Sequence, residues 1–377
     1  MKYKIINRKK LYGTMLFDII GNIAFLPLII FKKNEVIDSD IKEILIIRTA
    51  YIGDILMTLP ILKPLKEKFP KARISFIASR EGGELLKGNP YIDRIFHFNP
   101  FWFYKSSIKA YLQFLNQIRR ERFDLVIEAR GDIREILFII SFLKARFKLS
   151  YGFGGGAYLL THAVPFDKTK HRVEYHLDLV RYLGCSTDII EWGVYLSDDE
   201  KIRVREILKL NSVRKPFILV HPGARLSPKR WLIKNYTVLC DMLISKFRMT
   251  LVLLGSKQEK ELINNIIKNM KYKPVNLAGK LSLRELAGVI SEADLFICND
   301  SAPMHIAAAM KTPIVAIFGP SKSIETRPYF SNSRIVEKDV PCRNNCDENI
   351  CKHNVYHECM RSITPEEVFQ ACRDLIE

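Results

Sequence analysis

The chain has 377 residues, of which 48% are hydrophobic and 27% charged. This balance excludes a disordered chain, and the length allows two domains with hydrophobic cores. The formal net charge of +18 indicates attraction to anions, such as phosphorylated small molecules, anionic lipids or nucleic acid. The sequence has no helix-turn-helix, zinc-finger or RNP-like pattern, so we expect no nucleic-acid partner.

The first 40 residues form a basic and apolar extension. Residues 11–31 are about as long as a membrane span, but Asp18, Asn22 and Pro27 interrupt the apolar run. Residues 1–33 hold seven Lys or Arg against one Asp, and no signal-peptide cleavage site follows the apolar run. We predict a helix that lies on an anionic membrane surface. A membrane span and a helix docked on the protein itself are the alternatives.

From residue 41 the chain alternates strand and helix patterns. Apolar runs at 43–48, 73–79 and 123–129 predict strands, and residues 55–69 have helical spacing. Such alternation predicts a parallel sheet with helices on both faces. The glycine-rich stretch at 151–158 does not lie between a clear strand and a clear helix, so we expect a flexible loop rather than a phosphate-binding turn.

A second strand–helix series follows a polar helical stretch at 198–210. We expect strands at 216–223, 250–255, 275–279, 295–298 and 313–318, and helices at about 234–247 and 258–270. The whole pattern predicts an α/β protein of two doubly wound domains that face a cleft. We expect a membrane-associating extension at 1–40, a first domain at 41–205 and a second at 206–335. We expect the Cys-rich loop and C-terminal helix at 336–377 to pack back on the first domain.

Polar residues follow the predicted strands, where doubly wound proteins keep their ligands. Asp54 comes after the first strand and next to Gly53, at a strand-to-helix turn. It is either the N-cap of the helix or a carboxylate that takes a proton from an incoming hydroxyl.

In the second domain, the stretch "HPGARLSPKRW" at 221–231 follows the first strand. Lys229 and Arg230 are either part of a solvated basic loop or cations that bind a diphosphate. His221 could contact a phosphate as well, or could be a hydrogen-bonded histidine at a strand end.

The stretch "NDSAPMH" at 299–305 follows a later strand. Ser301 is placed to cap the next helix, whose free N–H groups would favour an anion. Asp300 would repel phosphate, so we expect it to accept hydrogen bonds from sugar hydroxyls. Neither half has a GxGxxG motif after its first strand, which is evidence against a nicotinamide enzyme.

Three segments together resemble glycosyltransferase family 9, the bacterial lipopolysaccharide heptosyltransferases and their relatives. They are "IRTAYIGDILMTLPILKPLKEKFPKARISFIA", "HPGARLSPKRW" and "ADLFICNDSAPMHIAAAMKTPIVAIFGPS", and the resemblance covers roughly residues 43–375. It implies a GT-B fold, with an acceptor domain first and a nucleotide-sugar domain second. It also implies an inverting transfer, with ADP-heptose as the favoured donor, onto a lipid-linked saccharide such as the lipopolysaccharide core. The expected location is the cytoplasmic face of the bacterial inner membrane.

The resemblance also implies roles for single residues. By matching position, Asp54 looks like the general base, Lys229 like the cation that holds the donor diphosphate and Asp300 like the carboxylate that binds the donor sugar. We expect the donor-binding set to be completed by Ser301, His305, Glu259, Arg230 and His221. The resemblance implies that the chemistry needs no metal or other cofactor, and it implies no acceptor-binding residue.

The sequence departs from the family at two places that bear on the sugar. Ala302 stands where the family usually has Gly, and "HPGA" replaces a Thr-rich turn. A family-9 transferase of another nucleotide sugar, acting in O-antigen, capsule or other glycan synthesis, is therefore the alternative. A non-catalytic sugar-nucleotide binder is a third interpretation, against which the presence of Asp54, Lys229 and Asp300 argues.

The eight cysteines are unevenly spread. Cys185, Cys240 and Cys298 are isolated, and we expect reduced core residues there. Four others form a cluster with His353 and His357 between them, which we call the cysteine cluster: Cys342, Cys346, Cys351 and Cys359. The cluster could be a structural zinc site or a set of reduced packing thiols, and a disulfide is the weaker alternative.

Overall fold

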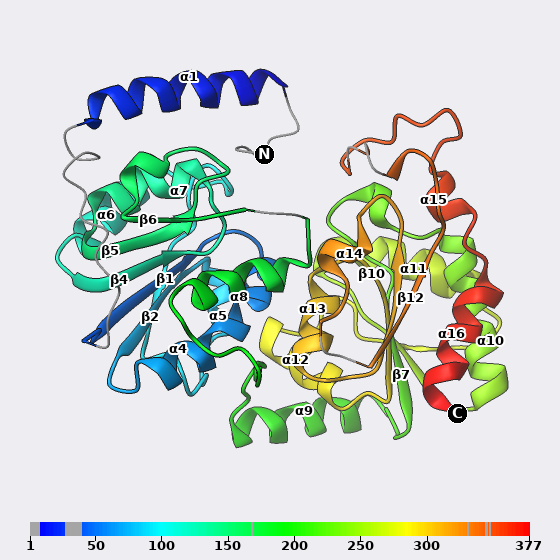
Figure 1. The fold of residues 1–377 in the computed structure, drawn as a ribbon. Helices are drawn as coiled ribbons and strands as arrows, with labels where there is room; N and C mark the ends of the chain where they lie inside the picture. Colours follow the sequence, from blue (N-terminus) through cyan, green and yellow to red (C-terminus); the bar gives the residue numbers. More distant parts are fainter. Residues whose placement is uncertain (1–7, 27–39, 167–168, 330–331, 344–345, 347) are drawn as a thin grey trace. The chain divides into compact units, whose positions relative to one another are not determined.

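The computed structural model describes residues 8–26, 40–166, 169–329, 332–343, 346 and 348–377. The chain divides into two compact units, Met1–Trp192 and Gly193–Glu377, and each contains one six-stranded sheet (Figure 1). The predicted boundary after residue 205 is wrong, because it falls inside helix α9 (Asp198–Leu210). This helix packs against α12 (Leu283–Ser291) and so belongs to the second unit.

The first unit has a parallel sheet in the order β3-β2-β1-β4-β5-β6. Its strands are β1 (Glu43–Arg48), β2 (Arg73–Ala78), β3 (Arg94–His97), β4 (Arg122–Glu128), β5 (Lys144–Tyr151) and β6 (His162–Val164). Its helices are α1 (Arg8–Ala24), α3 (Ile52–Thr58), η1 (Leu59–Ile61), α4 (Leu62–Lys68), α5 (Arg80–Glu84), α6 (Ile108–Ile118), α7 (Ile133–Phe138), η2 (Ile140–Phe142), η3 (Ala157–Leu159) and α8 (Arg172–Tyr182). The helix predicted at 55–69 is divided into α3, η1 and α4, because Pro60 at the start of η1 has no N–H to continue the ladder.

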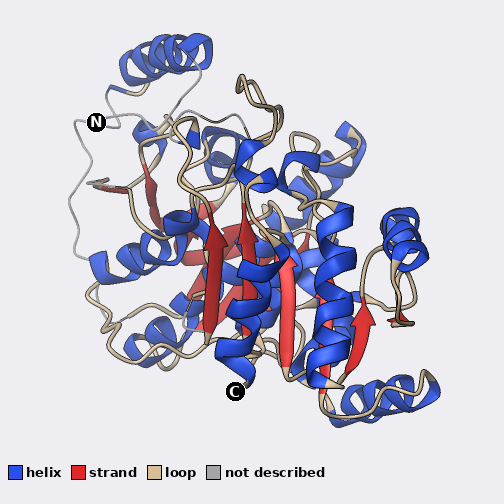
Figure 2. Ribbon diagram, turned by 90° about the vertical axis from the view of Figure 1, so that its right-hand side faces the viewer, coloured by secondary structure: helices blue, strands red, loops and turns tan. Residues whose placement is uncertain are grey.

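The second unit has a parallel sheet in the order β12-β11-β10-β7-β8-β9. Its strands are β7 (Phe217–His221), β8 (Thr250–Leu253), β9 (Val275–Asn276), β10 (Leu295–Asn299), β11 (Ile314–Phe318) and β12 (Ser333–Glu337). Its helices, besides α9 and α12, are η4 (Ser227–Lys229), α10 (Ile233–Phe247), η5 (Lys257–Glu259), α11 (Lys260–Asn269), α13 (Ala302–Ala309), α14 (Ser323–Thr326), α15 (Glu358–Arg361) and α16 (Pro365–Ile376). This unit faces the viewer in Figure 2, where helices flank its strands.

Both sheets are doubly wound, and each reverses its strand order at one point. The reversal lies between β1 and β4 in the first unit and between β7 and β10 in the second. The central strands β7, β10 and β11 are buried along their whole length, which explains why they appear in the sequence as continuous apolar runs. Ligands of doubly wound sheets bind at the carboxyl ends of the strands on either side of such a reversal.

The C-terminal helix α16 packs within the second unit. It contacts α10 and the strands β10, β11 and β12, and the rings of Phe247 and Phe369 stack with centroids 5.5 Å apart. Trp231 and Asn235 both donate hydrogen bonds to the carbonyl of Ile363, at 3.1 Å each. The prediction that the C-terminal segment packs on the first domain is therefore wrong. The apolar face of α16 belongs to the hydrophobic core on this side of the second sheet.

The N-terminal helix α1 lies against η3 of the first unit, as the docked alternative expected. Within the described part of the chain, none of the helices has both the length and the apolar character needed to cross a membrane. The end of the apolar run, including Pro27, falls outside the described residues.

Candidate active site

Asp54 lies in the first turn of α3, directly after β1, at the reversal point of the first sheet. It is the third residue of that helix, and the N-cap position belongs to Tyr51, so the N-cap interpretation of Asp54 is wrong. Tyr51, and not Gly53, has the positive φ, +45°. Its backbone N–H donates to the Tyr104 hydroxyl at 3.0 Å, and that hydroxyl donates to the carbonyl of Thr49 at 3.2 Å. Tyr104 thus holds the strained turn that positions Asp54.

Two arginines hold the Asp54 carboxylate. Arg48 Nη2 lies 2.8 Å and Arg172 Nη1 lies 3.1 Å from Asp54 Oδ1. The Arg48 side chain is 3% exposed, and its burial lowers the pKa of the guanidinium while Asp54 opposes that effect. Two atoms of Arg48, Nε and Nη1, have no hydrogen-bond partner in the described part of the structure.

A group of buried carboxyl groups beside this site was not predicted. Glu128 ends β4 and accepts hydrogen bonds from the Gly131 N–H, at 2.6 Å, and from the Ser150 hydroxyl. Its complete burial, together with neighbouring Glu135, raises its pKa well above the ordinary value. Glu135 in turn accepts a hydrogen bond from the Thr49 hydroxyl. Glu128 lies at the end of the strand predicted at 123–129, so the rule that found Asp54 points to Glu128 too.

Two further arginines of the same unit make cation–π contacts with one aromatic ring. The guanidinium carbons of Arg130 and Arg134 lie 4.5 Å and 4.4 Å from the centroid of the Phe103 ring. Asp132 caps α7 by accepting from the Arg134 N–H at 2.9 Å, and its carboxylate also pairs with both guanidinium groups. Arg130 Nη1 is buried and has no hydrogen-bond partner in the described structure. This arrangement fixes two cations near the carboxyl end of β4, where they can attract an anionic group.

In the second unit, Lys229 and Asp300 are partners of each other. Lys229 ends η4 after β7, and Asp300 follows β10, so the two lie on either side of the reversal point. Lys229 Nζ lies 2.8 Å from Asp300 Oδ2 and 2.7 Å from Glu348 Oε2. Burial alone would lower the pKa of Lys229, but the two carboxylates raise it above the ordinary value. The sequence analysis predicted that both residues bind the donor, but it did not predict that they form an ion pair with each other.

The start of α13 has no side-chain cap. Ser301 occupies the N-cap position, but its hydroxyl bonds to the Asn299 carbonyl at 3.3 Å and caps no helix N–H, contrary to prediction. Pro303 lies in the first turn, where its missing N–H costs nothing. His305 lies further along α13 and is buried. The Met304 N–H donates to the Ser301 carbonyl at 3.0 Å, so the dipole of this helix, rather than a set of free N–H groups, makes its N-terminus positive.

His221 and Glu259 meet at the carboxyl ends of β7 and β8. His221 Nε2 lies 3.5 Å from Glu259 Oε2, which also accepts a 2.8 Å hydrogen bond from the Ser256 N–H. Burial alone would raise the pKa of Glu259, but His221 and Ser256 lower it to about 2. A Cβ on Gly223 would lie 1.9 Å from Glu259 Oε1, so a larger residue there would displace the Glu259 carboxylate from His221 and the Ser256 N–H.

Asn299 connects the loops of the second unit. Its amide donates to the carbonyls of Pro222 and Gly223, at 2.8 Å and 3.2 Å. Its side-chain oxygen accepts from the Trp231 N–H and the Tyr236 hydroxyl, at 3.1 Å and 3.0 Å. Asn299 is therefore a positioning residue that the sequence argument did not single out. Arg230, predicted to bind the donor, uses its Nε to bond the carbonyl of Ala224 at 2.8 Å, within its own loop.

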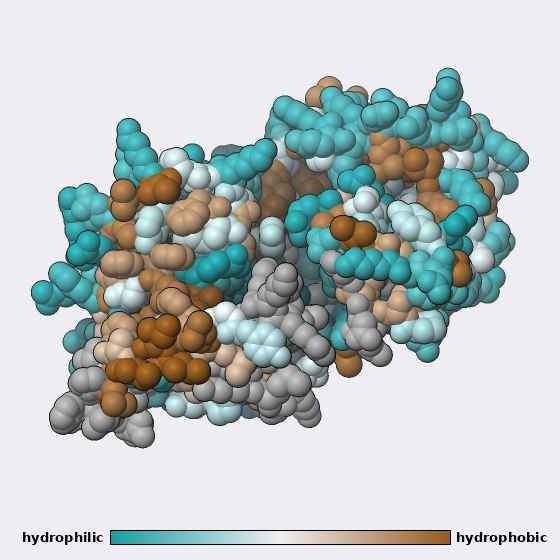
Figure 3. All heavy atoms as spheres, turned by 90° about the horizontal axis from the view of Figure 1, so that it is seen from above, coloured by the Kyte–Doolittle hydropathy of each residue, from teal (hydrophilic) through white to brown (hydrophobic). Residues whose placement is uncertain are grey.

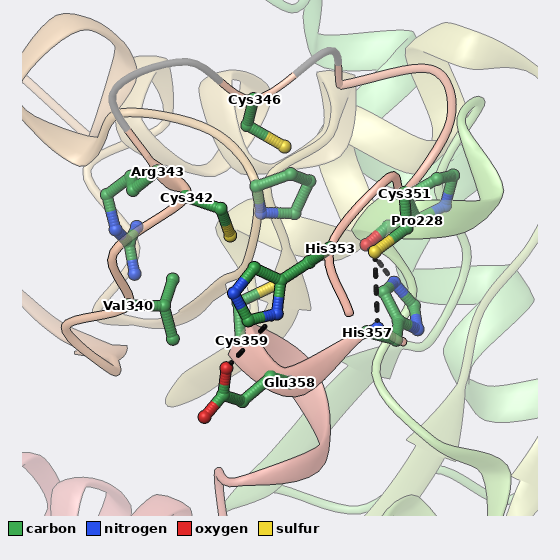
Figure 4. A pocket seen from close by; sticks show the side chains of 11 residues that line it. Pro228, Val340, Cys342, Arg343, Cys346, Cys351, His353, His357, Glu358 and Cys359 are labelled. Atoms are coloured by element: carbon green, nitrogen blue, oxygen red, sulfur yellow. Dashed lines mark hydrogen bonds and ion pairs between the residues drawn. The ribbon is translucent and has the colours of Figure 1, made fainter. Parts of the chain in front are cut away.

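The cysteine cluster lines one small pocket of the second unit, together with His353 and His357 (Figure 4). No disulfide joins these cysteines in the described structure, and burial with neighbouring thiols raises the pKa of Cys359 to about 11. His357 contacts the carbonyl of Pro228 at 2.6 Å, which joins the cluster to the loop that carries Lys229. The described residues contain no group of three or more His, Cys, Asp and Glu side chains arranged to hold a metal ion. The zinc site stays a prediction. Cys185, Cys240 and Cys298 are free and buried, as predicted.

Comparison with known proteins agrees with the architecture. Residues 111–356 match the model of glycosyltransferase family 9 (heptosyltransferase). The chain is 29% identical over 313 residues to lipopolysaccharide heptosyltransferase 3 of Escherichia coli, covering 79% of this chain and 90% of that one. It is 28% identical over 340 residues to lipooligosaccharide heptosyltransferase 2 of Campylobacter jejuni, covering 87% and 96%.

Solved structures show the same fold. A family 9 glycosyltransferase of Veillonella parvula has a TM-score of 0.78 at 21% identity, covering 90% of this chain and 99% of that one. The ADP-heptose lipopolysaccharide heptosyltransferase II of E. coli has a TM-score of 0.70 at 24% identity, covering 89% and 98%. Two doubly wound units of this kind make up the GT-B fold, which confirms the predicted fold class. The chain belongs to glycosyltransferase family 9, the family predicted from its motifs, and it is an enzyme of that class.

Proposed function

We propose that this enzyme transfers heptose from ADP-heptose to a lipid-linked saccharide of the lipopolysaccharide core, with inversion at the anomeric carbon. The curated relatives are named heptosyltransferases, and one solved relative is named for ADP-heptose. The observation that carries the proposal is the buried ion pair of Lys229 and Asp300 at the reversal point of the second sheet. We place the reaction at the cytoplasmic face of the inner membrane, where a lipid-linked acceptor would be available.

In the proposed donor site, Lys229 binds the diphosphate and Asp300 accepts hydrogen bonds from the sugar hydroxyls. The Lys229 side chain is 16% exposed and that of Asp300 is 7% exposed, whereas Glu348 is 41% exposed. Glu348 is therefore the partner that a diphosphate can replace on Lys229. The helix dipole at the start of α13 supplies further positive potential, with Ser301 and His305 in the same segment. His221, Glu259 and Arg230 complete the proposed donor site.

In the proposed reaction, an acceptor hydroxyl oxygen attacks the anomeric carbon of the donor. The bond from that carbon to the diphosphate oxygen breaks, and ADP leaves with the bonding electron pair. Asp54 takes the proton of the attacking hydroxyl. Lys229 and the α13 N-terminus stabilise the negative charge that develops on the diphosphate, and we propose that this chemistry needs no metal. Arg48 and Arg172 pair with the Asp54 carboxylate and fix its orientation.

Calorimetry of the purified protein with ADP-heptose and with UDP-, GDP- and dTDP-sugars tests the donor. We expect ADP-heptose to bind, and Lys229→Met to weaken it by about tenfold to a hundredfold, as lost charge-assisted hydrogen bonds would. Lys234→Met makes the same charge change on an exposed residue of α10, and it should leave binding unchanged. Preferential binding of another nucleotide sugar would favour the alternative, a family-9 transferase for O-antigen or capsule. Equal binding by the Lys229 variant would refute the donor site. NMR of the anomeric proton in the product tests inversion.

A further inference from the structure

Helix α1 contacts the first unit through a narrow stripe of polar and small residues. Asp18 is 4% exposed, and its Oδ1 accepts a hydrogen bond from the Gly156 N–H at 2.8 Å. Gly21 lies so close to Tyr158 that an added Cβ would be 2.2 Å from that ring. Thr14, Asp18 and Gly21 follow a spacing of four and three, so they form one face of the helix. This face is the docked one.

The rest of the helix surface is apolar and exposed. Seven large apolar side chains of α1 are between 39% and 69% exposed, and we call them the α1 apolar face: Tyr12, Met15, Leu16, Phe17, Ile19, Ile20 and Ile23. A surface helix of a globular protein normally turns its apolar face to the core and its polar face to water. Here the arrangement is reversed. Figure 3, which views the molecule from the side of α1, shows hydrophobic residues gathered on that surface of the first unit.

The glycine-rich stretch at 151–158, which we expected to be a flexible loop, holds α1 in this orientation. Gly155 and Gly156 have φ angles of +95° and +79°, which side chains rarely permit. A Cβ on Gly155 would also lie 2.6 Å from the Cγ2 atom of Thr14. The loop therefore needs glycine both for its backbone and for the close approach of the helix. The apolar face of α1 is exposed because the opposite face of the helix packs closely against the loop at 151–158.

The charge around α1 indicates what covers this face. The helix begins with Arg8, Lys9 and Lys10, and residues 1–33 hold seven Lys or Arg. Asp18 is the single acidic residue of that segment, and it is buried against the protein. The exposed apolar side chains of α1 thus lie within a stretch of sequence whose net charge is strongly positive. A second copy of this chain would bring the same positive charge and be repelled, whereas an anionic lipid surface would be attracted.

We propose that α1 binds the surface of an anionic bilayer, with its apolar face at the boundary of headgroups and acyl chains and its axis in the plane of the membrane. None of the described helices could cross a bilayer, and a helix with one apolar face and basic flanks is of the kind that lies in the interface. The first unit, which contains the proposed base Asp54, is then held at the surface where a lipid-linked acceptor lies. The proposal rests on the proposed function only for that acceptor, because binding to lipid can be measured without any sugar.

Sedimentation of the full-length protein with vesicles tests the proposal. One set of vesicles contains phosphatidylcholine alone, and the other contains added phosphatidylglycerol. We expect binding to the anionic vesicles that weakens as salt increases, and we expect Leu16→Gln/Ile20→Gln/Ile23→Gln to weaken it by about tenfold or more. The control carries Ile189→Gln and Leu210→Gln, which remove exposed apolar side chains outside α1 and should bind as wild type does. Gln keeps a good helix propensity, and circular dichroism of each variant verifies the fold.

Equal vesicle binding by the triple variant and the wild type would overturn the proposal. A wild-type protein that binds no vesicles would also overturn it. If light scattering then shows a dimer that the triple substitution abolishes, a second copy of the chain covers the α1 apolar face instead. A wild-type protein that binds anionic vesicles but no nucleotide sugar would refute the proposed function and leave this inference standing.

Discussion

Substituting Asp54 by Asn separates the catalytic and the structural roles of this carboxylate. Asn keeps the size of the side chain, but it removes the charge and the ability to take a proton. Loss of a positioned general base lowers kcat by about a hundredfold to ten-thousandfold. We expect that loss in Asp54→Asn. Binding of ADP-heptose should change little, because the proposed donor residues lie in the second unit.

The same substitution should destabilise the fold, by an amount that burial sets. The Asp54 and Arg48 side chains are 11% and 3% exposed, and removing one partner of such a buried pair costs about 3–5 kcal/mol. The Asn oxygen can still accept one hydrogen bond from Arg48, so we expect about 3 kcal/mol. Arg172 is 42% exposed, and its pair with Asp54 contributes about 0–1 kcal/mol. Arg172→Ala is therefore the matched control for stability.

Two measurements check these values. Release of ADP in the presence of donor and acceptor gives kcat, and urea unfolding monitored by circular dichroism gives the free energy of unfolding. A kcat for Asp54→Asn within a few fold of the wild-type value would refute the general-base role. An unfolding free energy equal to that of the wild type would refute the argument from the buried pair, whatever the activity.

Three further predictions concern the second unit. Gly223→Ala should destabilise the protein and weaken nucleotide-sugar binding, because its Cβ, 1.9 Å from Glu259 Oε1, would displace that carboxylate from His221 and the Ser256 N–H. Gly13→Ala, at an open position of α1, is the control, and equal melting temperatures of the two variants would contradict the steric argument. The pKa of Glu259 is lowered to about 2 from 4.5, so the folded state binds fewer protons than the unfolded state in acid. The free energy of unfolding should then fall as the pH drops from about 5 to about 2, and Glu259→Gln should flatten that fall. An unchanged acid limb would show that Glu259 contributes nothing there. Finally, the zinc interpretation of the cysteine cluster predicts about one zinc ion per chain by mass spectrometry of purified protein, lost in Cys359→Ser. Metal-free wild-type protein would leave the four thiols as packing residues.

Much of the fold could be predicted from local patterns. The strands at 43–48 and 73–78 appear in the sequence as short apolar runs, and they match β1 and β2 in the structure. The polar stretches after the strands located Asp54, Lys229 and Asp300 at the reversal points of the two sheets, because carboxyl ends of parallel strands share one edge. Strand β3 was missed, since four residues with one buried position give little signal.

Contacts between distant residues could not be predicted from those patterns. Arg172 pairs with Asp54 from 118 residues away, and Lys229 pairs with Asp300 from 71 residues away. Nothing local in the sequence specifies such pairs, because they depend on how the strands are ordered in the sheet.

The sequence by itself determined the strand–helix alternation, the polar residues at strand ends and the family, since each depends on residues close together in the chain. Only the tertiary structure decided which charges meet, that α16 completes the second core, and that α1 docks by its polar face. The composition of α1 is compatible with either face inward. The close fit of Asp18 and Gly21 against the loop at 151–158 selected the orientation that leaves the apolar face exposed.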